Sequence, residues 1–315
     1  MAPKKPNKND KVFITGHLGM VGSAIVRGLV KKGYNNLLTR TRKELDLLNQ
    51  DEVFKFLHEE KPDYIFIAAA KVGGIHANNT FRAQFIYENL VLETNIIHGA
   101  YLAGVQRLCF LGSSCIYPRD CSQPIKEEYL LTGLLEPTNE PYAISKIAGI
   151  KMCESYNRQY GTQYISAMPT NLYGLNDNYD PNTSHVLPAL IRKAHQAKMT
   201  NEKKLVVWGS GKPMREFLYV DDAADAFIFM MENKVNEEIL NVGTGEEISI
   251  KKLAETVMNV IGFKGEIVFD TDKPDGTPRK LVSVERLRQL GWQATTKLED
   301  GIRKAYHDFL KQNRD

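Results

Sequence analysis

The sequence predicts an α/β protein with a Rossmann-type doubly wound parallel sheet, followed by a smaller, mixed α/β substrate domain. Short apolar segments alternate with helical patterns as far as about residue 171, which is typical of βαβ units. A glycine-rich turn, Gly16-His-Leu-Gly-Met-Val-Gly22, separates the first apolar segment from the first helical pattern. Beyond this half the segments become irregular and rich in Asn, Asp and Pro, which indicates a second unit.

The first half predicts alternating strands and helices. The apolar segments that we expect as strands are residues 11–15, 36–39, 63–68, 107–111 and 164–168. The segments that we expect as helices are residues 21–32, 50–60, 81–102 and 142–160.

The second half predicts a loop over residues 176–184, a helix over 188–198, a strand over 205–208, a strand ending near 241–245 and a loop over 270–279. We therefore assign residues 1–175, with parts of 214–245, to the Rossmann domain. Residues 176–213 and 246–315 form most of the smaller second domain.

The composition is that of a soluble globular protein. Of the 315 residues, 43% are hydrophobic and 25% charged. The 41 basic and 38 acidic residues leave a net charge of +3, too small to indicate a nucleic-acid partner. No run reaches transmembrane length, and the leader lacks the apolar core of a signal peptide. The 4 cysteines lack metal-binding spacing. We expect a cytoplasmic protein with free thiols, no metal site and no membrane partner.

The glycine turn predicts a dinucleotide site. Gly16, Gly19 and Gly22 permit a tight turn and a close backbone approach to a pyrophosphate at the start of the first helix, which Met20 and Val21 open. The second strand ends in Thr39-Arg-Thr-Arg42 rather than in the carboxylate usual for NAD. Arg40 suits a 2′-phosphate, which favours NADP(H), although both arginines could instead be ordinary loop charges.

Ser113, Tyr142 and Lys146 form a pattern for proton transfer at a carbonyl. Tyr142 and Lys146 are four residues apart on an expected helix, so both lie on one face. A lysine ammonium near the tyrosine is expected to lower the pKa of the phenol. Ser113 follows an expected strand and can hydrogen-bond the substrate oxygen. Cys115 lies two residues further and adds an acid/base group, although a buried structural cysteine is the commoner case.

These motifs resemble those of the GDP-L-fucose synthases, which are extended short-chain dehydrogenases/reductases. The most specific similarity lies in Gly112-Ser-Ser-Cys-Ile-Tyr-Pro118 and in Ala68-Ala-Ala-Lys-Val-Gly-Gly-Ile75. The other similar segments are residues 16–24, 136–146, 154–161, 169–174, 207–217 and 273–280. The resemblance covers nearly the whole chain. One residue departs from the pattern, because Leu18 stands where some relatives carry an arginine near the 2′-phosphate.

The resemblance implies a bifunctional epimerase-reductase that acts on GDP-4-keto-6-deoxy-D-mannose. Cys115 would be the base and His185 the acid of a C3/C5 epimerisation, and Tyr142 would protonate the oxygen at C4 after hydride transfer from NADPH. By itself, His185 is more often a loop or helix-cap histidine than a catalytic one. The resemblance also implies a homodimer built on the helices near residues 81–102 and 142–160.

Further contacts follow from the same resemblance. The residues expected to bind the cofactor, besides those of the glycine turn, are Arg40, Leu111, Gly112, Ser113, Lys146, Pro169, Asn171, Leu172 and His185. The residues expected to bind the substrate are Ser114, Asn171, Lys193, Trp208, Arg215 and Asp275. From spacing alone, Trp208 is a core tryptophan and Lys193 and Asp275 are surface charges.

Two other functions remain compatible with the fold. One is an NAD-dependent nucleotide-sugar 4-epimerase or dehydratase, although a 4-epimerase needs no Cys/His pair and a dehydratase would require a carboxylate pair near the serine. The other is a non-catalytic NADP-sensing protein, which would have no need of Ser113, Tyr142 and Lys146.

Overall fold

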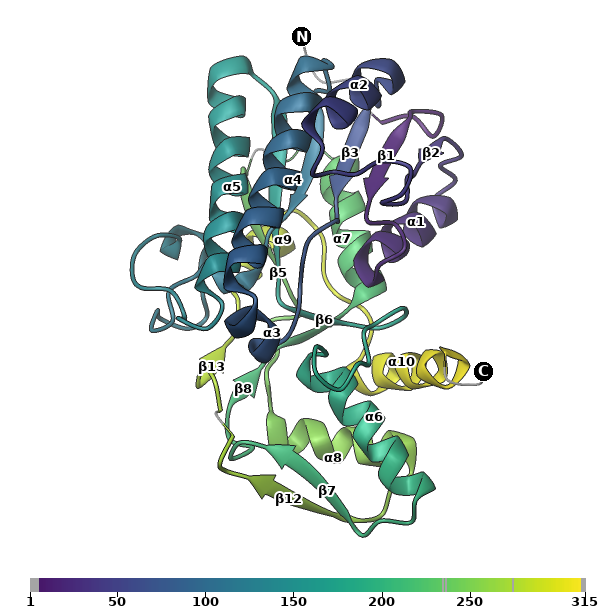
Figure 1. The fold of residues 1–315 in the computed structure, drawn as a ribbon, viewed down its shortest axis with the longest axis vertical. Coiled ribbons are helices and arrows are strands. Elements are labelled where there is room, and N and C mark those ends of the chain that lie inside the picture. Colours follow the sequence, from purple (N-terminus) through teal and green to yellow (C-terminus); the bar gives the residue numbers. More distant parts are fainter. Residues whose placement is uncertain (1–5, 234, 236, 274, 313–315) are drawn as a thin grey trace.

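The computed structural model describes residues 6–233, 235, 237–273 and 275–312, and its centre is a six-stranded parallel sheet (Figure 1). The strand order is β10-β5-β4-β3-β1-β2, and every neighbouring pair is parallel. The strands are β1 (Val12–Thr15), β2 (Leu37–Leu38), β3 (Tyr64–Ile67), β4 (Arg107–Leu111), β5 (Gln163–Pro169) and β10 (Ile239–Val242). The predicted fold class is confirmed.

Helices cover both faces of this sheet. On one face lie α1 (Met20–Lys31), α7 (Val220–Glu232) and α9 (Glu285–Gln289), whose apolar side chains share a buried cluster with Val12 and Phe66. On the other face lie α2 (Gln50–Glu60), α4 (Arg82–Leu102) and α5 (Glu140–Tyr160), which bury a cluster around Phe13 and Phe110. Because both faces are covered, the central strands are apolar at nearly every position rather than at alternate ones.

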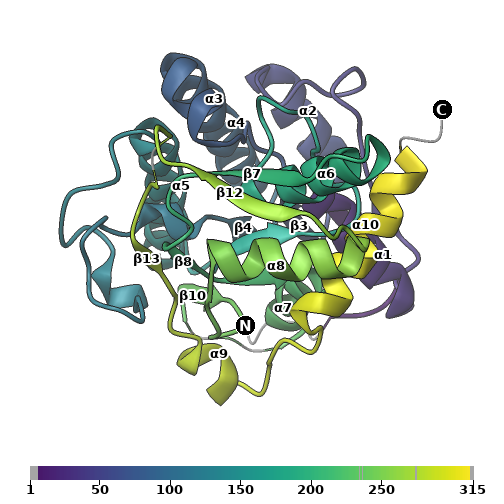
Figure 2. The same ribbon diagram turned by 90° about the horizontal axis from the view of Figure 1, so that it is seen from below.

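A second layered unit lies beyond the sheet and has its own core (Figure 2). Its helices α6 (Val186–Met199), α8 (Ile250–Ile261) and α10 (Leu298–Gln312) pack around the parallel pair β7 (Lys204–Trp208) and β12 (Glu266–Asp270). The shorter strands are β6 (Asn171–Tyr173) paired with β9 (Phe217–Tyr219), and β8 (Met214–Arg215) lying between β11 (Ile248–Ser249) and β13 (Arg279–Lys280).

Several helices differ from the prediction. The segment before residue 81, for which the sequence predicted no element, contains the short helix α3 (Ile75–Thr80), which contacts α4. Helices α7, α8, α9 and α10 were not predicted either. Helix α5 begins at Glu140 rather than at residue 142, because Pro141 is well tolerated in the first helical turn, where no intrahelical N–H bond is lost.

The strand order places a topological switch point between β1 and β3. From β1 the chain runs to β2 on one side, and it then crosses to β3 on the other. Doubly wound sheets bind ligands at the carboxyl ends of the strands at such a point. Gly16 follows β1 there, and a Cβ on Gly16 would lie 2.9 Å from the backbone of Ala69, which follows β3. The glycine turn therefore lies where a cofactor is expected.

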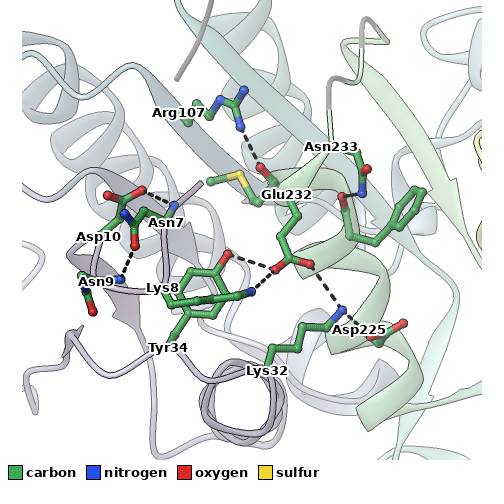
Figure 3. Close-up of polar contacts among 12 residues, drawn as sticks. Asn7, Lys8, Asn9, Asp10, Lys32, Tyr34, Arg107, Asp225, Glu232 and Asn233 are labelled. Carbon is green, nitrogen blue, oxygen red and sulfur yellow. Dashed lines mark hydrogen bonds and ion pairs between the residues drawn. The ribbon is translucent and has the colours of Figure 1, made fainter. Parts of the chain in front are cut away.

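A charged network joins the N-terminal segment to the end of α7 (Figure 3). Glu232 accepts hydrogen bonds from Lys8 at 2.7 Å and from the Tyr34 hydroxyl at 3.0 Å. Lys32 bridges Glu232 and Asp225. Arg107, the first residue of β4, donates to the carbonyl of Met231 at 2.8 Å. This network therefore fastens the amino ends of the strands, at the edge opposite the switch point, and it is structural.

Candidate active site

The glycine turn has the geometry of a pyrophosphate cradle. Gly16 has φ +66°, a left-handed conformation that other residues adopt only with strain. A Cβ on Gly22 would overlap the carbonyl oxygen of Gly16, so the turn cannot close around a larger residue. Gly19 is the N-cap of α1, with no side chain that could cap the free N–H groups. Met20 and Val21 follow in the first turn and pack against the core, which leaves the backbone of the turn for an anion.

The two arginines after β2 differ in their surroundings. Arg40 pairs with Glu60 at 3.1 Å, and its guanidinium lies 5.1 Å from the ring centroid of Phe56. Arg42 is mostly exposed, and its nearest carboxylate, that of Asp46, is 3.9 Å away. Leu18 is also exposed. Arg40 is thus held by Glu60, whose carboxylate also pairs with Lys11 just before β1, whereas Arg42 is more exposed and more weakly paired.

Ser113 lies at the carboxyl end of β4. Leu111 ends this strand, and the N–H of Gly112 continues its pairing by donating to Ala167 of β5 at 2.9 Å. Ser113 caps the 3₁₀ turn η1 (Ser114–Ile116) by accepting from the N–H of Cys115 at 3.2 Å, and Ser114 is buried behind it. This cap fixes the spacing between the serine hydroxyl and the thiol.

Helix α5 brings Tyr142 and Lys146 to the same place. The Ser113 hydroxyl acts on the phenol of Tyr142 and partly opposes the rise of its pKa, so the two side chains are neighbours in the site. Lys146 is almost completely buried, and its Nζ lies 2.8 Å from Oε1 of Glu93 on α4. Burial raises the pKa of Glu93, and Lys146 opposes that shift. An ion pair buried this completely costs much desolvation, so we infer that it serves the site rather than stability.

The expected lowering of the Tyr142 pKa is wrong for this structure. Burial, together with the negative charges of Cys115 and Glu93, raises the pKa of Tyr142 above its ordinary value. Lys146 does not reverse this shift because its charge is balanced by Glu93. The phenol of Tyr142 is consequently protonated at neutral pH, which suits a group that must deliver a proton.

Cys115 is half-buried beside a cation. Its Sγ lies 3.3 Å from Nζ of Lys280 on β13. Burial alone would raise the pKa of the thiol, but the charge of Lys280 and hydrogen bonds from Ser113 and Lys280 outweigh it, so the pKa of Cys115 lies below its ordinary value. Burial raises the pKa of Cys109 and Cys153, which lie in the core as the sequence predicts for structural cysteines. Cys115 is therefore the thiol suited to act as a base.

His185 is held by a contact between the two halves of the chain. It is the N-cap residue of α6. Two residues before it, the carbonyl of Thr183 accepts the N–H of Gly74 at 3.0 Å. A Cβ on Gly74 would lie 2.9 Å from the carbonyl oxygen of Ser184, so the approach requires glycine. Desolvation by the surrounding chain and the charge of Lys280 lower the pKa of His185.

The segment after β5 lies on the same side of the sheet. Pro169 ends β5 and is buried, and Asn171 and Leu172 follow in β6. Asn171 donates through Nδ2 to the carbonyl of Glu216 at 2.7 Å, and Leu172 packs against the core. The side-chain amide of Asn171 is therefore held in a fixed orientation at the carboxyl edge of the sheet, where the cofactor turn also lies.

The residues expected to bind the nucleotide gather in the second unit. Trp208 is 55% exposed, so the core interpretation is wrong, and the Nζ of Lys193 lies 5.1 Å from its ring centroid. Arg215 lies 3.5 Å from the carbonyl of Asp275. The Asp275 carboxylate accepts the N–H of Ser210 at 2.6 Å and its hydroxyl at 2.7 Å. An exposed indole among cations can receive an aromatic base and its diphosphate.

Two residues of the site were missed in the sequence. Glu93 interrupts the apolar pattern of α4 at a buried position, between Leu92 and Ile96, and this interruption is a signal that could have revealed it. Lys280 follows the Pro/Gly/Asp loop and carries no such signal, because only the pairing of β13 with β8 brings it to Cys115.

The switch-point glycine turn and the Ser113–Tyr142–Lys146 centre define a nicotinamide-dependent short-chain dehydrogenase/reductase. The model of the "NAD dependent epimerase/dehydratase family" matches residues 12–243. The chain is 58% identical over 304 residues to "Putative GDP-L-fucose synthase 2" of Arabidopsis thaliana, an alignment that covers 96% of this chain and 93% of the relative. The chain belongs to this family and, within it, to the GDP-L-fucose synthases.

Two further comparisons agree. The chain is 55% identical over 312 residues to "GDP-L-fucose synthase" of Escherichia coli, covering 96% of this chain and 97% of the relative. The structure is similar to that of a GDP-L-fucose synthetase from Naegleria fowleri bound to NADP, with a TM-score of 0.90 and 31% identity over 98% of this chain and 97% of that one.

Two features are absent from the part of the chain that the structure describes. None of its helices is long and apolar enough to cross a membrane. Nor do three His, Cys, Asp or Glu side chains come together there as metal ligands would.

Proposed function

We propose that this protein converts GDP-4-keto-6-deoxy-D-mannose into GDP-L-fucose, by inverting C3 and C5 and then reducing C4 with NADPH. The observation that carries this proposal is the thiol of Cys115, which has a lowered pKa, lies 3.3 Å from Nζ of Lys280 and acts electrostatically on the reductase tyrosine Tyr142. A reductase alone requires the tyrosine but not the thiol. The near full-length similarity to relatives named GDP-L-fucose synthase supports both activities.

The epimerisation uses acid and base groups on opposite sides of the sugar. A ketone at C4 acidifies the protons at C3 and C5, because the electron pair left behind spreads onto the ketone oxygen. The Cys115 thiolate takes the proton, forming S–H, and His185 returns a proton to the opposite face. Ser113 and Tyr142 donate hydrogen bonds to the C4 oxygen and so stabilise the enolate.

The reduction uses the same hydroxyl groups. Bound NADPH supplies the hydride to C4. Tyr142, kept protonated by its raised pKa, then donates its proton to the new C4 alkoxide. Lys146, fixed by Glu93, is placed to hold the nicotinamide ribose. The glycine turn holds the pyrophosphate, and Pro169, Asn171, Leu172 and His185 complete the pocket.

NADP(H) is the proposed cofactor. The positive charges at Arg40 and Arg42, in the position after β2 where NAD enzymes usually carry a carboxylate, support it. The Naegleria fowleri structure bound to NADP supports it as well.

The proposed substrate unit comprises residues 176–213 and most of 246–315. In it Trp208 stacks on guanine, Lys193 and Arg215 bind the diphosphate, and Asp275 accepts hydrogen bonds from ribose or base. Ser114 and Asn171 contact the sugar.

Incubation with the keto-sugar and NADPH in deuterated water tests the proposed function. We expect GDP-L-fucose with deuterium at both C3 and C5, and one NADP⁺ released for each product. The same incubation with NADH should be markedly slower, because NADH lacks the 2′-phosphate that Arg40 and Arg42 attract. Product without deuterium at these carbons would contradict the epimerase assignment. Equal rates with the two cofactors would contradict NADP preference, and NADPH binding without turnover would indicate a sensor.

We also propose a homodimer formed by α4 and α5. These two helices pack against each other, and their outer surfaces expose large apolar side chains: Tyr87 and Leu102 on α4, and Ile144 and Tyr160 on α5. An exposed apolar surface of this kind is typical of protein interfaces. Light scattering should give twice the mass of the chain, and a Leu102→Glu variant should give the monomer mass. A monomeric wild type would contradict the dimer.

A further inference from the structure

Lys280 approaches the thiol of Cys115 from the other half of the chain. Its Nζ donates to Sγ at 3.3 Å, across 165 residues of sequence. Both side chains are partly buried, so the charge of Lys280 is less screened than that of a surface lysine. Arg279, the preceding residue, instead pairs with Glu247 at 2.7 Å and is mostly exposed. Of the two cations of β13, only Lys280 contacts the thiol.

Backbone hydrogen bonds fix the position of Lys280. Ile125, in the loop after Cys115, donates to the carbonyl of Leu281 at 2.7 Å and accepts from the N–H of Ser283 at 2.7 Å. The N–H of Leu281 donates to Oε1 of Gln123 at 2.8 Å, and that of Val282 to the buried carboxylate of Glu216 at 3.0 Å. The strand that carries Lys280 is thus fastened to the loop that carries Cys115. A lysine held in this way is preorganised rather than a mobile surface charge.

The charges around Cys115 favour the thiolate. Lys280 and Ser113 stabilise the negative sulfur, whereas burial and the carboxylate of Glu136 oppose it. Arg215, paired with Lys280 in the neighbouring strand, also interacts with the charge of Cys115, and so does the phenol of Tyr142. Lys280 makes the largest of the contributions that favour the charged form. Without Lys280, burial and the carboxylate of Glu136 would determine the pKa of Cys115 and would raise it.

We propose that Lys280 holds Cys115 as a thiolate and thereby makes it competent to remove the protons at C3 and C5. This inference rests on the proposed function. In the step, the C–H bond breaks, the S–H bond forms, and the electron pair passes to the C4 oxygen. Lys280 keeps its proton and loses its counter-charge, so its role is electrostatic, and it has no role in hydride transfer.

Alkylation of the free enzyme with iodoacetamide at a series of pH values tests this role without any substrate. Mass spectrometry separates Cys115 from the other three cysteines. In Lys280→Met the apparent pKa of Cys115 should rise by about 1–3 units, since an opposite charge within 4–6 Å is removed. Lys280→Arg keeps the charge and should stay near the wild type. Arg279→Gln removes a charge from the same strand and should leave the profile unchanged. Superimposable profiles for Lys280→Met and wild type would overturn the proposal.

Catalysis gives a second, independent readout. Deuterium incorporation at C3 and C5 should fall at least about tenfold in Lys280→Met at neutral pH, as expected when a general base is mostly protonated. The loss should shrink as the pH rises through the new thiol pKa. Oxidation of GDP-L-fucose by NADP⁺, which needs no base at C3 or C5, should change little, and an equal loss of both activities would overturn the proposal. A wild type that alkylates as expected but exchanges no deuterium would instead refute the proposed function.

Discussion

Cys115→Ser is expected to lower deuterium exchange at C3 and C5 by about 10²–10⁴-fold, the usual contribution of a general base. The serine hydroxyl occupies nearly the same volume, but it ionises far less readily than a thiol, and Lys280 cannot compensate for that difference. Oxidation of GDP-L-fucose by NADP⁺ should persist, because Ser113, Tyr142 and Lys146 are unchanged. The measurement is the deuterium content at each carbon by NMR, together with NADPH formation in the reverse direction.

Cys121→Ser is the matched control for this prediction. Cys121 is partly buried in the loop after the active-site turn, and burial raises the pKa of its thiol. We expect both activities to stay near the wild-type values in this variant. If Cys115→Ser exchanged deuterium at the wild-type rate, the assignment of the base would be wrong.

Tyr142→Phe is expected to give the opposite result to Cys115→Ser, a loss of hydride transfer with deuterium exchange retained. Hydride transfer should fall by about 10²–10⁴-fold in both directions, because the phenol proposed to give the C4 oxygen its proton is removed. Deuterium exchange should be slower but measurable, since the Ser113 hydroxyl still donates to the enolate oxygen and the Cys115 thiolate is retained. Stopped-flow absorbance of NADPH measures hydride transfer, and NMR of the recovered keto-sugar measures deuterium exchange.

Tyr160→Phe, on the same helix, is the control for the loss of a phenolic hydroxyl. Tyr160 lies at the far end of α5, where its ring stacks on that of Tyr101, and a phenylalanine keeps this contact. Both activities of the Tyr160→Phe variant should match those of the wild type. Retention of hydride transfer in Tyr142→Phe would show that another group supplies the proton. Taken together, the Cys115 and Tyr142 variants should separate the two activities of one site.

Much of the fold could be predicted because its signals are local. The apolar strands, the helix patterns and the turn from Gly16 to Gly22 are each encoded within a few residues, so the Rossmann-type sheet follows from them. Tyr142 and Lys146 also lie within one helical turn, and their shared face needs no tertiary information. Helix α3 was not predicted and α5 was predicted to start two residues too late, because a very short helix and a helix end both carry little periodicity.

The electrostatics of the site could not be predicted in this way. The sequence indicates that Lys146 lowers the pKa of Tyr142, but in the fold burial raises that pKa, and Glu93 from a different helix pairs with Lys146. Trp208 likewise could not be separated from a core residue until the second unit left its ring exposed. Both the pKa of Tyr142 and the exposure of Trp208 depend on residues that lie far away in the sequence and pack nearby only in the fold.

By itself, then, the sequence determined the fold class and the family, and it predicted the cofactor turn and the proposed reacting groups Ser113, Cys115, Tyr142 and Lys146. Only the tertiary structure decided the surroundings that shift the pKa of Cys115 and of Tyr142. Lys280 reaches Cys115 across 165 residues, and Glu93 reaches Lys146 between two packed helices. A pKa depends on the charges and the burial within a few ångströms, and that neighbourhood exists only once distant segments have packed together.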